Sequence, residues 1–176
     1  AALPVTATAR PASAADDPYA LSLTTDMPGK VIVLNVGISR IHFGVYDTRD
    51  LGSDVTGVID NADPAAARIR VAVGSQTRSL EREPFPIEQL FPVMQEACAL
   101  LGSHFALHLP EIVAVGHRVV HGGNRFSSAV VVTPGVIADI EALSRFAPLH
   151  NPQNLAGIRE AMKRLPHVPH VAVFDT

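Results

Sequence analysis

The chain has 176 residues, 47% of them hydrophobic and 18% charged, which is enough for one domain with an apolar core of ordinary size. Its 14 Lys and Arg against 17 Asp and Glu give a net charge of -3, so no basic excess indicates a nucleic acid or an anionic membrane as partner. A single cysteine, Cys98, excludes an internal disulfide, and no apolar run approaches the ~20 residues that cross a bilayer. This composition is typical of a globular protein in a reducing compartment.

The first thirty residues differ in composition from the rest of the chain. Residues 1–30 contain eight Ala and four Pro, and their apolar residues follow no lasting period. Because the spaced prolines interrupt any helix that the alanines favour, we expect a tail or linker here. The folded domain is therefore predicted to cover residues 31–176.

Strand patterns open the folded segment. Val31–Leu34 is an apolar run typical of a buried strand, and Ile41–Val45 alternates as a second strand does. Gly37 lies between them, so we predict a hairpin with its turn at this glycine. Weaker strand patterns cover residues 55–60 and 69–73.

Three helices are predicted further along the chain. Pro86–Leu101 has apolar residues at spacings of three and four and is followed by Gly102, which is typical of a helix end. Cys98 lies on this apolar stripe, which favours a core residue over a nucleophile. Thr133 and Asn151 each precede a proline, so we predict them as the N-caps of two further helices.

Two more strand patterns complete the alternation of strands and helices. Ile112–Val115 is apolar, with an extension or a second strand through Val120, and Val168–Phe174 follows the last helix. Strands that alternate with helices indicate an α/β layer structure.

The first polar cluster is the predicted turn at residues 35–40. Gly37 lets backbone amides approach a ligand closely, and Asn35 and Ser39 supply neutral hydrogen-bonding groups. Such a turn can hold a phosphate group, although the same residues also suit an ordinary hairpin turn.

The second cluster is residues 116–123, Gly-His-Arg-Val-Val-His-Gly-Gly. On an extended strand His117 and His121 would lie about 13 Å apart at ~3.3 Å per residue, too far to share a metal ion. The Arg118 guanidinium, beside a strand end and a glycine pair, suits bidentate capture of a carboxylate or phosphate. An internal ion pair is the alternative for this arginine.

Two further polar positions lie near predicted element ends. His150 comes just before a helix N-terminus, where free amides and the helix dipole favour anions, although a loop histidine can equally be a surface residue. Asp175 follows the last strand, and ligand sites of α/β proteins gather outside such strand ends. A solvated carboxylate is the alternative for Asp175.

Taken together and in this order, these motifs resemble the acetate kinase family, part of the acetate and sugar kinase, heat-shock protein and actin superfamily. The resemblance covers residues 31–176. It rests on Val-Ile-Val-Leu-Asn-Val-Gly at 31–37, Gly-His-Arg-Val-Val-His-Gly-Gly at 116–123, Ala-Pro-Leu-His-Asn-Pro at 147–152 with Asn154-Leu155, and Val-Phe-Asp-Thr at 173–176.

The resemblance implies a fold and an activity. The expected fold is a ribonuclease H-like lobe of the actin-like ATPase superfamily, with a mixed sheet flanked by helices. The expected reaction is Mg²⁺-dependent phosphoryl transfer between ATP and acetate, or another short-chain carboxylate, giving acetyl phosphate and ADP. A cytoplasmic location, a homodimer of the full-length form and no nucleic-acid or membrane partner are also implied.

The resemblance further assigns roles to individual residues. Arg118, His150 and Asp175 match the family's catalytic residues, and Arg118 also matches the arginine that binds the carboxylate. Val120 and Leu149 match the residues that line the pocket for the acetate methyl group. The nucleotide side corresponds to the first turn, namely Asn35, Gly37, Ser39, Arg40 and His42, with Asn35 also near the metal.

The first turn and the chain length depart from the family pattern. The family turn reads Asn-x-Gly-Ser-Ser-Ser-x-Lys, whereas Ile38 and Arg40 replace the outer serines here and His42 replaces the lysine. Family members are about twice this length or more, so we expect an amino-terminal lobe without the second, nucleotide-binding lobe, inactive when alone. A catalytically defective binding or interaction lobe is the alternative function.

Overall fold

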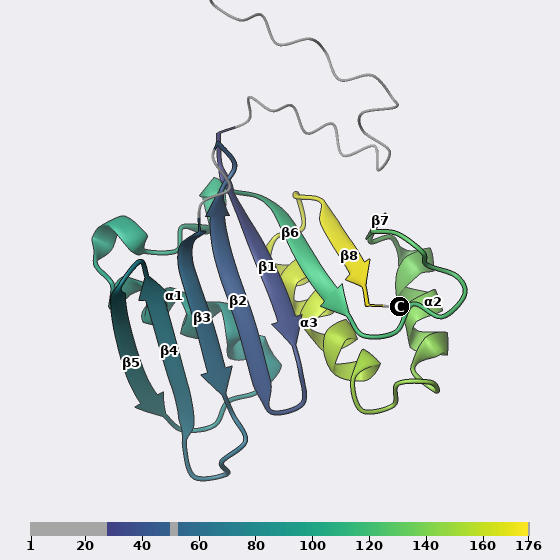
Figure 1. Cartoon of the computed structure of the whole chain (residues 1–176), viewed down its shortest axis with the longest axis horizontal. Helices are drawn as coiled ribbons and strands as arrows, with labels where there is room; N and C mark the ends of the chain where they lie inside the picture. The colour runs from purple at the N-terminus through teal and green to yellow at the C-terminus, as the bar shows by residue number, and fades with distance from the viewer. Residues whose placement is uncertain (1–27, 50–52, 176) are drawn as a thin grey trace, which may run out of the picture.

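The computed structural model describes residues 28–49 and 53–175, and the tail predicted for the first thirty residues lies outside this part except for its last three. One mixed eight-stranded sheet forms the body of the protein (Figure 1). The strands are β1 (Lys30–Val36), β2 (Arg40–Asp47), β3 (Ser53–Asp60), β4 (Ala67–Val73), β5 (Gln76–Arg82), β6 (Ile112–Val119), β7 (Val130–Val131) and β8 (His170–Phe174). The α-helices are α1 (Leu90–Ala99), α2 (Pro134–Leu143) and α3 (Asn151–Arg164), and the 3₁₀ helices are η1 (Ile87–Gln89), η2 (Ser103–Phe105) and η3 (Leu109–Glu111).

The sheet combines an antiparallel half with a parallel half. Its strand order is β5-β4-β3-β2-β1-β6-β8-β7, and β1 to β5 pair as successive antiparallel neighbours. Strands β6 and β8 run parallel to β1, while the short β7 closes the edge antiparallel to β8. The carboxyl ends of β1, β6 and β8 therefore lie side by side at one edge of the sheet, which is where α/β proteins place their ligands.

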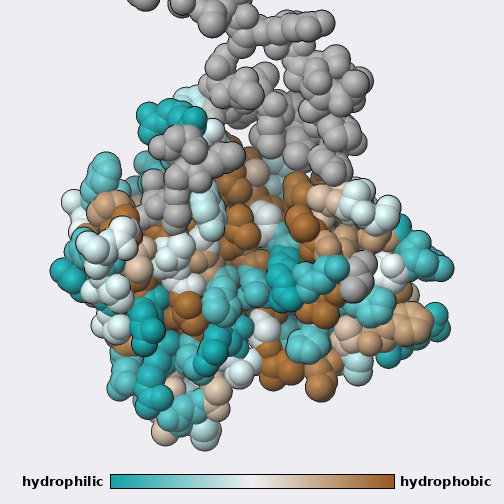
Figure 2. All heavy atoms as spheres, in the orientation of Figure 1, coloured by the Kyte–Doolittle hydropathy of each residue, from teal (hydrophilic) through white to brown (hydrophobic). Residues whose placement is uncertain are grey.

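Within residues 28–49 and 53–175, the helices cover one face of the sheet and leave the other open. In β1, Ile32, Leu34 and Val36 are buried, and α1 and α3 lie against the face to which they point (Figure 1). On the opposite face, Val33 and Val173 are 41% and 50% exposed. Hydrophilic side chains gather over the middle of this uncovered face (Figure 2). The sheet thus has an apolar core on one side and an open surface with polar groups on the other.

Helix α3 packs closely against β1 at Gly157. A Cβ atom at this position would lie 2.5 Å from Cγ2 of Val36, closer than side chains approach one another. The missing side chain lets the helix backbone sit directly over the end of β1. This contact fixes the N-terminal half of α3 beside the carboxyl ends of the central strands.

The predicted α/β class is confirmed, as are the first hairpin and the Thr133 cap of α2, whose hydroxyl accepts from the Val136 amide at 3.3 Å. The first helix begins later than predicted, at Leu90, after a 3₁₀ turn. Pro92 explains the difference, because a proline lacks its amide hydrogen and fits only the first turn of an α-helix. In a helix that began at Pro86, it would lie in the interior.

Two strands were absent from the sequence prediction, β5 and β7. The β5 segment reads Gln-Thr-Arg-Ser-Leu-Glu-Arg and has exposed or half-buried residues throughout, because it forms an edge of the sheet. Such a strand carries no apolar alternation, and β7 has only two residues. Across residues 28–49 and 53–175, no helix has the length and apolarity required to span a membrane.

Candidate functional site

Three predicted site residues meet at the carboxyl edge of the parallel strands. Asn35 lies near the end of β1, Arg118 near the end of β6, and Asp175 directly after β8. The Arg118 Nε donates to Asp175 Oδ1 at 3.0 Å, and its Nη2 donates to the other carboxylate oxygen. The Arg118 Nη1 donates to Asn35 Oδ1 at 3.1 Å. One guanidinium therefore joins three strands that are far apart in the sequence.

The Arg118 guanidinium keeps donors for a ligand. A guanidinium has five N–H groups, and the bonds to Asp175 and Asn35 use three of them. The two that remain lie one on each terminal nitrogen, and the side chain is 45% exposed. The ion pair that the sequence left as an alternative is thus present, and it orients the arginine while leaving two donors for a carboxylate or phosphoryl oxygen.

The start of α3 holds the segment that follows Arg118. The Asn154 side chain accepts from the Val120 amide at 3.1 Å and donates to the Val36 carbonyl at 2.8 Å. The Asn151 side chain accepts from the His121 amide at 3.2 Å and donates to the His121 carbonyl at 3.1 Å. Both asparagines are buried, so these bonds are shielded from water and fix the backbone beside the site.

The predicted cap of α3 is wrong by one residue. The N-cap is His150, and Asn151 is the first helical residue, because its side chain binds the backbone of His121 and is not available to cap its own helix. The His150 side chain is exposed and, within the described part of the chain, makes no hydrogen bond. It is therefore open to a ligand at the helix N-terminus.

The two residues predicted for the methyl pocket come from the loop after β6 and from the loop before α3. Val120 is half-buried, and its backbone amide is held by Asn154. Leu149 is 65% exposed and precedes His150. An apolar side chain this exposed, beside the exposed His150, is able to contact a small apolar substituent.

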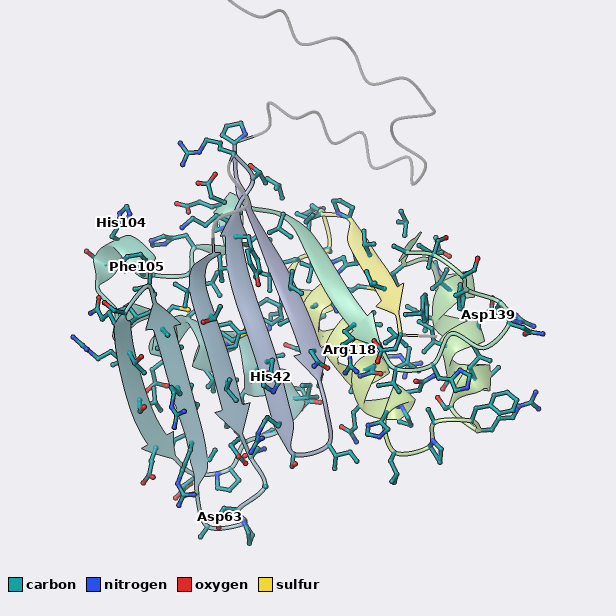
Figure 3. All side chains as sticks on the ribbon, in the orientation of Figure 1. His42, Asp63, His104, Phe105, Arg118 and Asp139 are labelled. Atoms are coloured by element: carbon teal, nitrogen blue, oxygen red, sulfur yellow. The ribbon has the colours of Figure 1, made fainter. Side chains whose placement is uncertain are left out.

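The turn between β1 and β2 is shaped by its backbone and by one ion pair. The Gly37 amide donates to the Arg40 carbonyl at 3.0 Å, and Ser39 is exposed. Arg40 binds Asp60 on β3 at 2.6 Å, which keeps the pKa of the Asp60 carboxyl below its usual value. His42 lies opposite Asn35 in the strand register and is exposed on β2 (Figure 3). Arg40 is thus tied to its neighbouring strand, whereas Ser39 and His42 face solvent.

His117 and His121 occupy different environments. The buried Nε2 of His117 lies 3.1 Å from Nδ1 of His170, and burial together with the neighbouring imidazole lowers the pKa of His117 to about 3. The His121 Nδ1 instead accepts from the Gly123 amide at 2.8 Å. Among residues 28–49 and 53–175, no group of three or more His, Cys, Asp or Glu side chains is arranged to hold a metal ion.

The environment of Cys98 agrees with its prediction as a core residue. Its side chain is fully buried in α1, and burial raises the pKa of the thiol to about 11. A thiol of this kind is protonated at neutral pH and is a poor nucleophile.

The oxygen atoms at the carboxyl edge fit a magnesium ion that is held mainly by phosphate. Mg²⁺ prefers hard oxygen ligands and usually takes one or two from the protein, with the rest from water and phosphate. Asn35 Oδ1 and the Asp175 carboxylate are such oxygens, and both already face the cationic Arg118. These two groups suit a magnesium ion whose other ligands are phosphate and water, and they do not form a complete set of protein ligands.

The sequence analysis missed the roles of Asn151 and Asn154. A signal for them exists, because Asn151, Asn154 and Ile158 follow the buried stripe of α3 at helical spacing. A polar side chain on such a stripe needs a hydrogen-bonding partner. The spacing does not show which backbone groups are the partners, since Val36, Val120 and His121 lie thirty or more positions away along the chain.

Known proteins resemble this chain over most of its length. Residues 30–176 match the Acetokinase family. An acetate kinase from Streptomyces avermitilis is 38% identical over 85% of this chain and 37% of its own length, and one from Thermotoga maritima is 40% identical over 84% and 36%.

Solved structures agree with these relatives. An acetate kinase from Porphyromonas gingivalis has a TM-score of 0.73 and 32% identity, and a propionate kinase from Francisella tularensis has a TM-score of 0.72 and 32% identity. Each match covers 84% of this chain and 37% of the other. The chain therefore spans just over a third of the length of these relatives. Its fold is that of an acetate kinase-like α/β lobe of the actin-like ATPase type, and the chain belongs to the acetokinase family.

Proposed function

We propose that residues 31–176 form the amino-terminal lobe of an acetate kinase, which transfers a phosphoryl group between ATP and acetate to give ADP and acetyl phosphate. The observation that carries this proposal is the Arg118 guanidinium, held by Asp175 and Asn35 at the carboxyl edge with two donors left over. Membership of the acetokinase family supports the same reaction.

Arg118 is proposed to bind the acetate carboxylate and the phosphoryl group during its transfer. Phosphoryl transfer depends mainly on positioning and on charge stabilisation, and one well-placed arginine can contribute a rate factor of ~10³–10⁵. Asp175 fixes the orientation of this arginine through two hydrogen bonds. His150, exposed at the start of α3, is proposed to donate to the phosphoryl oxygens.

The acyl group is proposed to rest against Val120 and Leu149. A pocket that distinguishes acetate from propionate by one methylene gains only ~1–3 kcal/mol, so both acids are candidate substrates. The structural likeness to an acetate kinase and to a propionate kinase at nearly equal TM-scores is consistent with this range.

The nucleotide side is proposed to use the turn between β1 and β2. Gly37 shapes this turn through its amide, which donates to the Arg40 carbonyl, and it adds no side chain that would obstruct a phosphate. Ser39 and His42 offer exposed polar side chains, Arg40 offers a guanidinium that would have to leave Asp60, and Asn35 offers an oxygen. When bound with ATP, Mg²⁺ would neutralise charge on the phosphate oxygens. The Asn35 amide and the Asp175 carboxylate would orient it from the protein side.

The complete reaction is proposed for a longer polypeptide that includes this lobe. The chain spans just over a third of its relatives, so the remaining active-site groups and most of the adenosine contacts would come from a second lobe. A homodimer and a cytoplasmic location are proposed for that longer form.

A binding lobe without catalysis is the second candidate function. Ile38 stands in the turn where the family has a serine, and it is 57% exposed. Arg40 is tied to Asp60 and is therefore not free to act as a phosphate donor without losing that pair. Both features weaken the nucleotide side while leaving the Arg118 site intact.

Acetyl phosphate formation separates the two functions. The lobe is fused to the carboxy-terminal part of the Thermotoga maritima relative and assayed with acetate, ATP and Mg²⁺ by trapping acetyl phosphate as the hydroxamate. If the lobe belongs to an acetate kinase, acetyl phosphate should form only when acetate, ATP and Mg²⁺ are all present. Saturable acetate binding without product, in a fusion that binds ATP, would support the binding lobe instead. A second fusion that carries Ile38→Ser and Arg40→Ser then tests whether the turn is the cause.

A further inference from the structure

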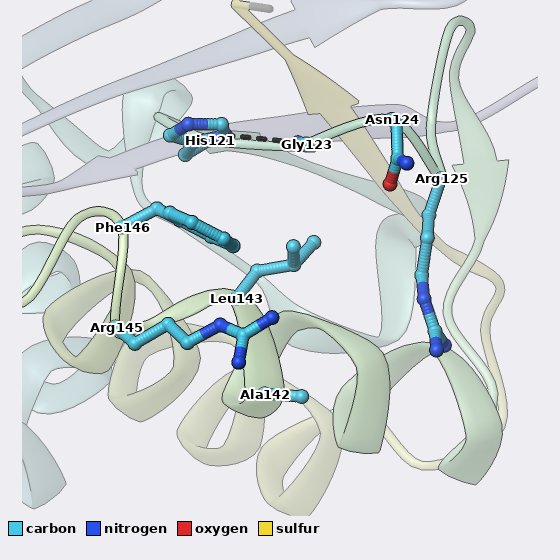
Figure 4. Close-up of a pocket in the computed structure, with 8 residues that line it drawn as sticks. All are labelled: His121, Gly123, Asn124, Arg125, Ala142, Leu143, Arg145 and Phe146. Carbon is cyan, nitrogen blue, oxygen red and sulfur yellow. Dashed lines mark hydrogen bonds between the residues drawn. The ribbon is translucent and has the colours of Figure 1, made fainter.

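A hollow lies beside the candidate site and shares none of its proposed residues. It has a volume of about 590 Å³ and lies between the loop after β6 and the end of α2 (Figure 4). This volume falls within the ~300–1,000 Å³ of small-molecule sites. Its lining consists of His121, Gly123, Asn124, Arg125, Ala142, Leu143, Arg145 and Phe146.

The charged side chains of the hollow are both cationic. Arg125 and Arg145 line it, and none of the eight lining residues is an aspartate or a glutamate. Arg125 forms an ion pair with Asp139 on α2. Arg145 has no carboxylate partner within residues 28–49 and 53–175, and its Cζ lies 4.7 Å from the centre of the Phe146 ring. A planar guanidinium without an acidic partner is a ready donor pair for an anion.

The rest of the hollow offers aromatic and apolar surface. The His121 and Phe146 rings are 5.6 Å apart at their centres and inclined by 34°. Phe146 is 56% exposed, and Leu143 and Ala142 complete the apolar part of the wall (Figure 4). Exposed aromatic surface beside a guanidinium favours a planar ligand body that stacks against both.

The wall of the hollow is rigidly held on the loop side. The Gly123 amide donates to His121 Nδ1 at 2.8 Å, which leaves the proton of the neutral imidazole on Nε2. Gly123 has a φ of +60°, and a Cβ atom there would lie 2.7 Å from Cδ2 of Leu143. The loop therefore sits directly on α2, while Asn151 fixes the His121 backbone from α3. The hollow is formed before any ligand binds.

We propose that this hollow is a binding site for a small aromatic anion, in which the Arg145 guanidinium holds the anionic group and the Phe146 ring stacks on the aromatic body. The absence of acidic lining residues excludes a cation as the favoured ligand, and the aromatic wall distinguishes the site from one for a bare inorganic anion. The site does not depend on the phosphoryl-transfer function of Arg118.

Phenyl phosphate is the probe for this site. It is titrated into the ¹⁵N-labelled 176-residue chain, and amide shifts are followed by NMR. Saturable shifts are expected at Gly123, Arg145 and Phe146, with a dissociation constant of about 1 mM or tighter. Inorganic phosphate is expected to bind at least about tenfold more weakly, because it gains no stacking energy.

Two variants test the residues, with a matched control. Arg145→Gln and Phe146→Ala are each expected to weaken phenyl phosphate binding about tenfold or more. Arg78→Gln on β5 removes the same charge from an exposed arginine that bonds only to the Thr77 carbonyl within the described part of the chain, and it should leave binding unchanged. Unsaturable shifts, equal binding of inorganic phosphate, or parent-like binding by Arg145→Gln would overturn the proposal. Each of these results leaves the acetyl phosphate assay unaffected, so the two proposals fail separately.

Discussion

Replacing Asn154 with alanine tests whether the start of α3 holds the candidate site together. This buried side chain donates to the Val36 carbonyl at 2.8 Å and accepts from the Val120 amide at 3.1 Å. The change removes both bonds, and a buried polar group that loses its partner costs ~1–3 kcal/mol. Val120 is half-buried, so water can replace part of its bond. We therefore expect a loss of about 2–4 kcal/mol in the free energy of unfolding.

Urea denaturation followed by circular dichroism measures this loss. The midpoint should fall for Asn154→Ala while the slope with denaturant stays the same, since the folded state remains compact. Asn124→Ala is the control, because Asn124 is exposed and such surface changes stay within about 0.5 kcal/mol. If Asn154→Ala unfolds at the same urea concentration as the control, the two hydrogen bonds do not hold the segment after Arg118.

Three further predictions concern the core. Burial lowers the pKa of His117 to about 3 in the folded chain, whereas an exposed histidine has a pKa near 6.5. Below pH 6.5 the unfolded chain therefore binds a proton that the folded chain does not. The free energy of unfolding should fall by up to ~1.4 kcal/mol per pH unit from pH 6.5 towards pH 3. Urea midpoints between pH 7 and pH 5 check this, and a His117→Phe chain that keeps the same slope would contradict it. Gly157→Ala should lower the melting temperature, because its Cβ would lie 2.5 Å from Val36. Gly135→Ala in α2, whose Cβ would come no closer than 3.7 Å to another atom, should raise the melting temperature through helix propensity. Equal shifts for the two variants would show that the close packing of α3 on β1 does not determine the stability at Gly157. The Cys98 thiol, with its pKa raised to about 11, should react with iodoacetamide only after unfolding in urea, and rapid labelling of the native chain would be inconsistent with its burial.

Much of the fold follows from local patterns in the sequence. The Thr133-Pro134 start of α2 and the apolar runs of β1, β2 and β8 carry their own signals, since they depend on neighbours in sequence. The β5 strand carries no such signal, because it is an edge strand with a polar sequence and its partner β4 alone defines it. Local patterns thus predict elements that bury one face and miss those that do not.

The candidate site was predictable in its residues but not in its contacts. Arg118 and Asp175 are chemically conspicuous at strand ends, so sequence reasoning can select them. Their bidentate pairing depends on β6 and β8 being parallel neighbours, which no local pattern shows. The same holds for Asn151, whose position before a proline indicates a cap although its side chain binds a distant backbone.

The most direct test of the account concerns Arg118 in the fused, longer enzyme. If its guanidinium binds the carboxylate and the phosphoryl group, Arg118→Ala should lower kcat for acetyl phosphate formation about 10³-fold or more. Arg118→Lys should recover only a small part of the rate, because a lysine cannot keep both Asp175 and a ligand in a bidentate arrangement. The free energy of unfolding of the lobe should change by no more than about 1 kcal/mol, as for other exposed ion pairs. An Arg118→Ala enzyme with the kcat and KM of the parent would contradict this role of Arg118.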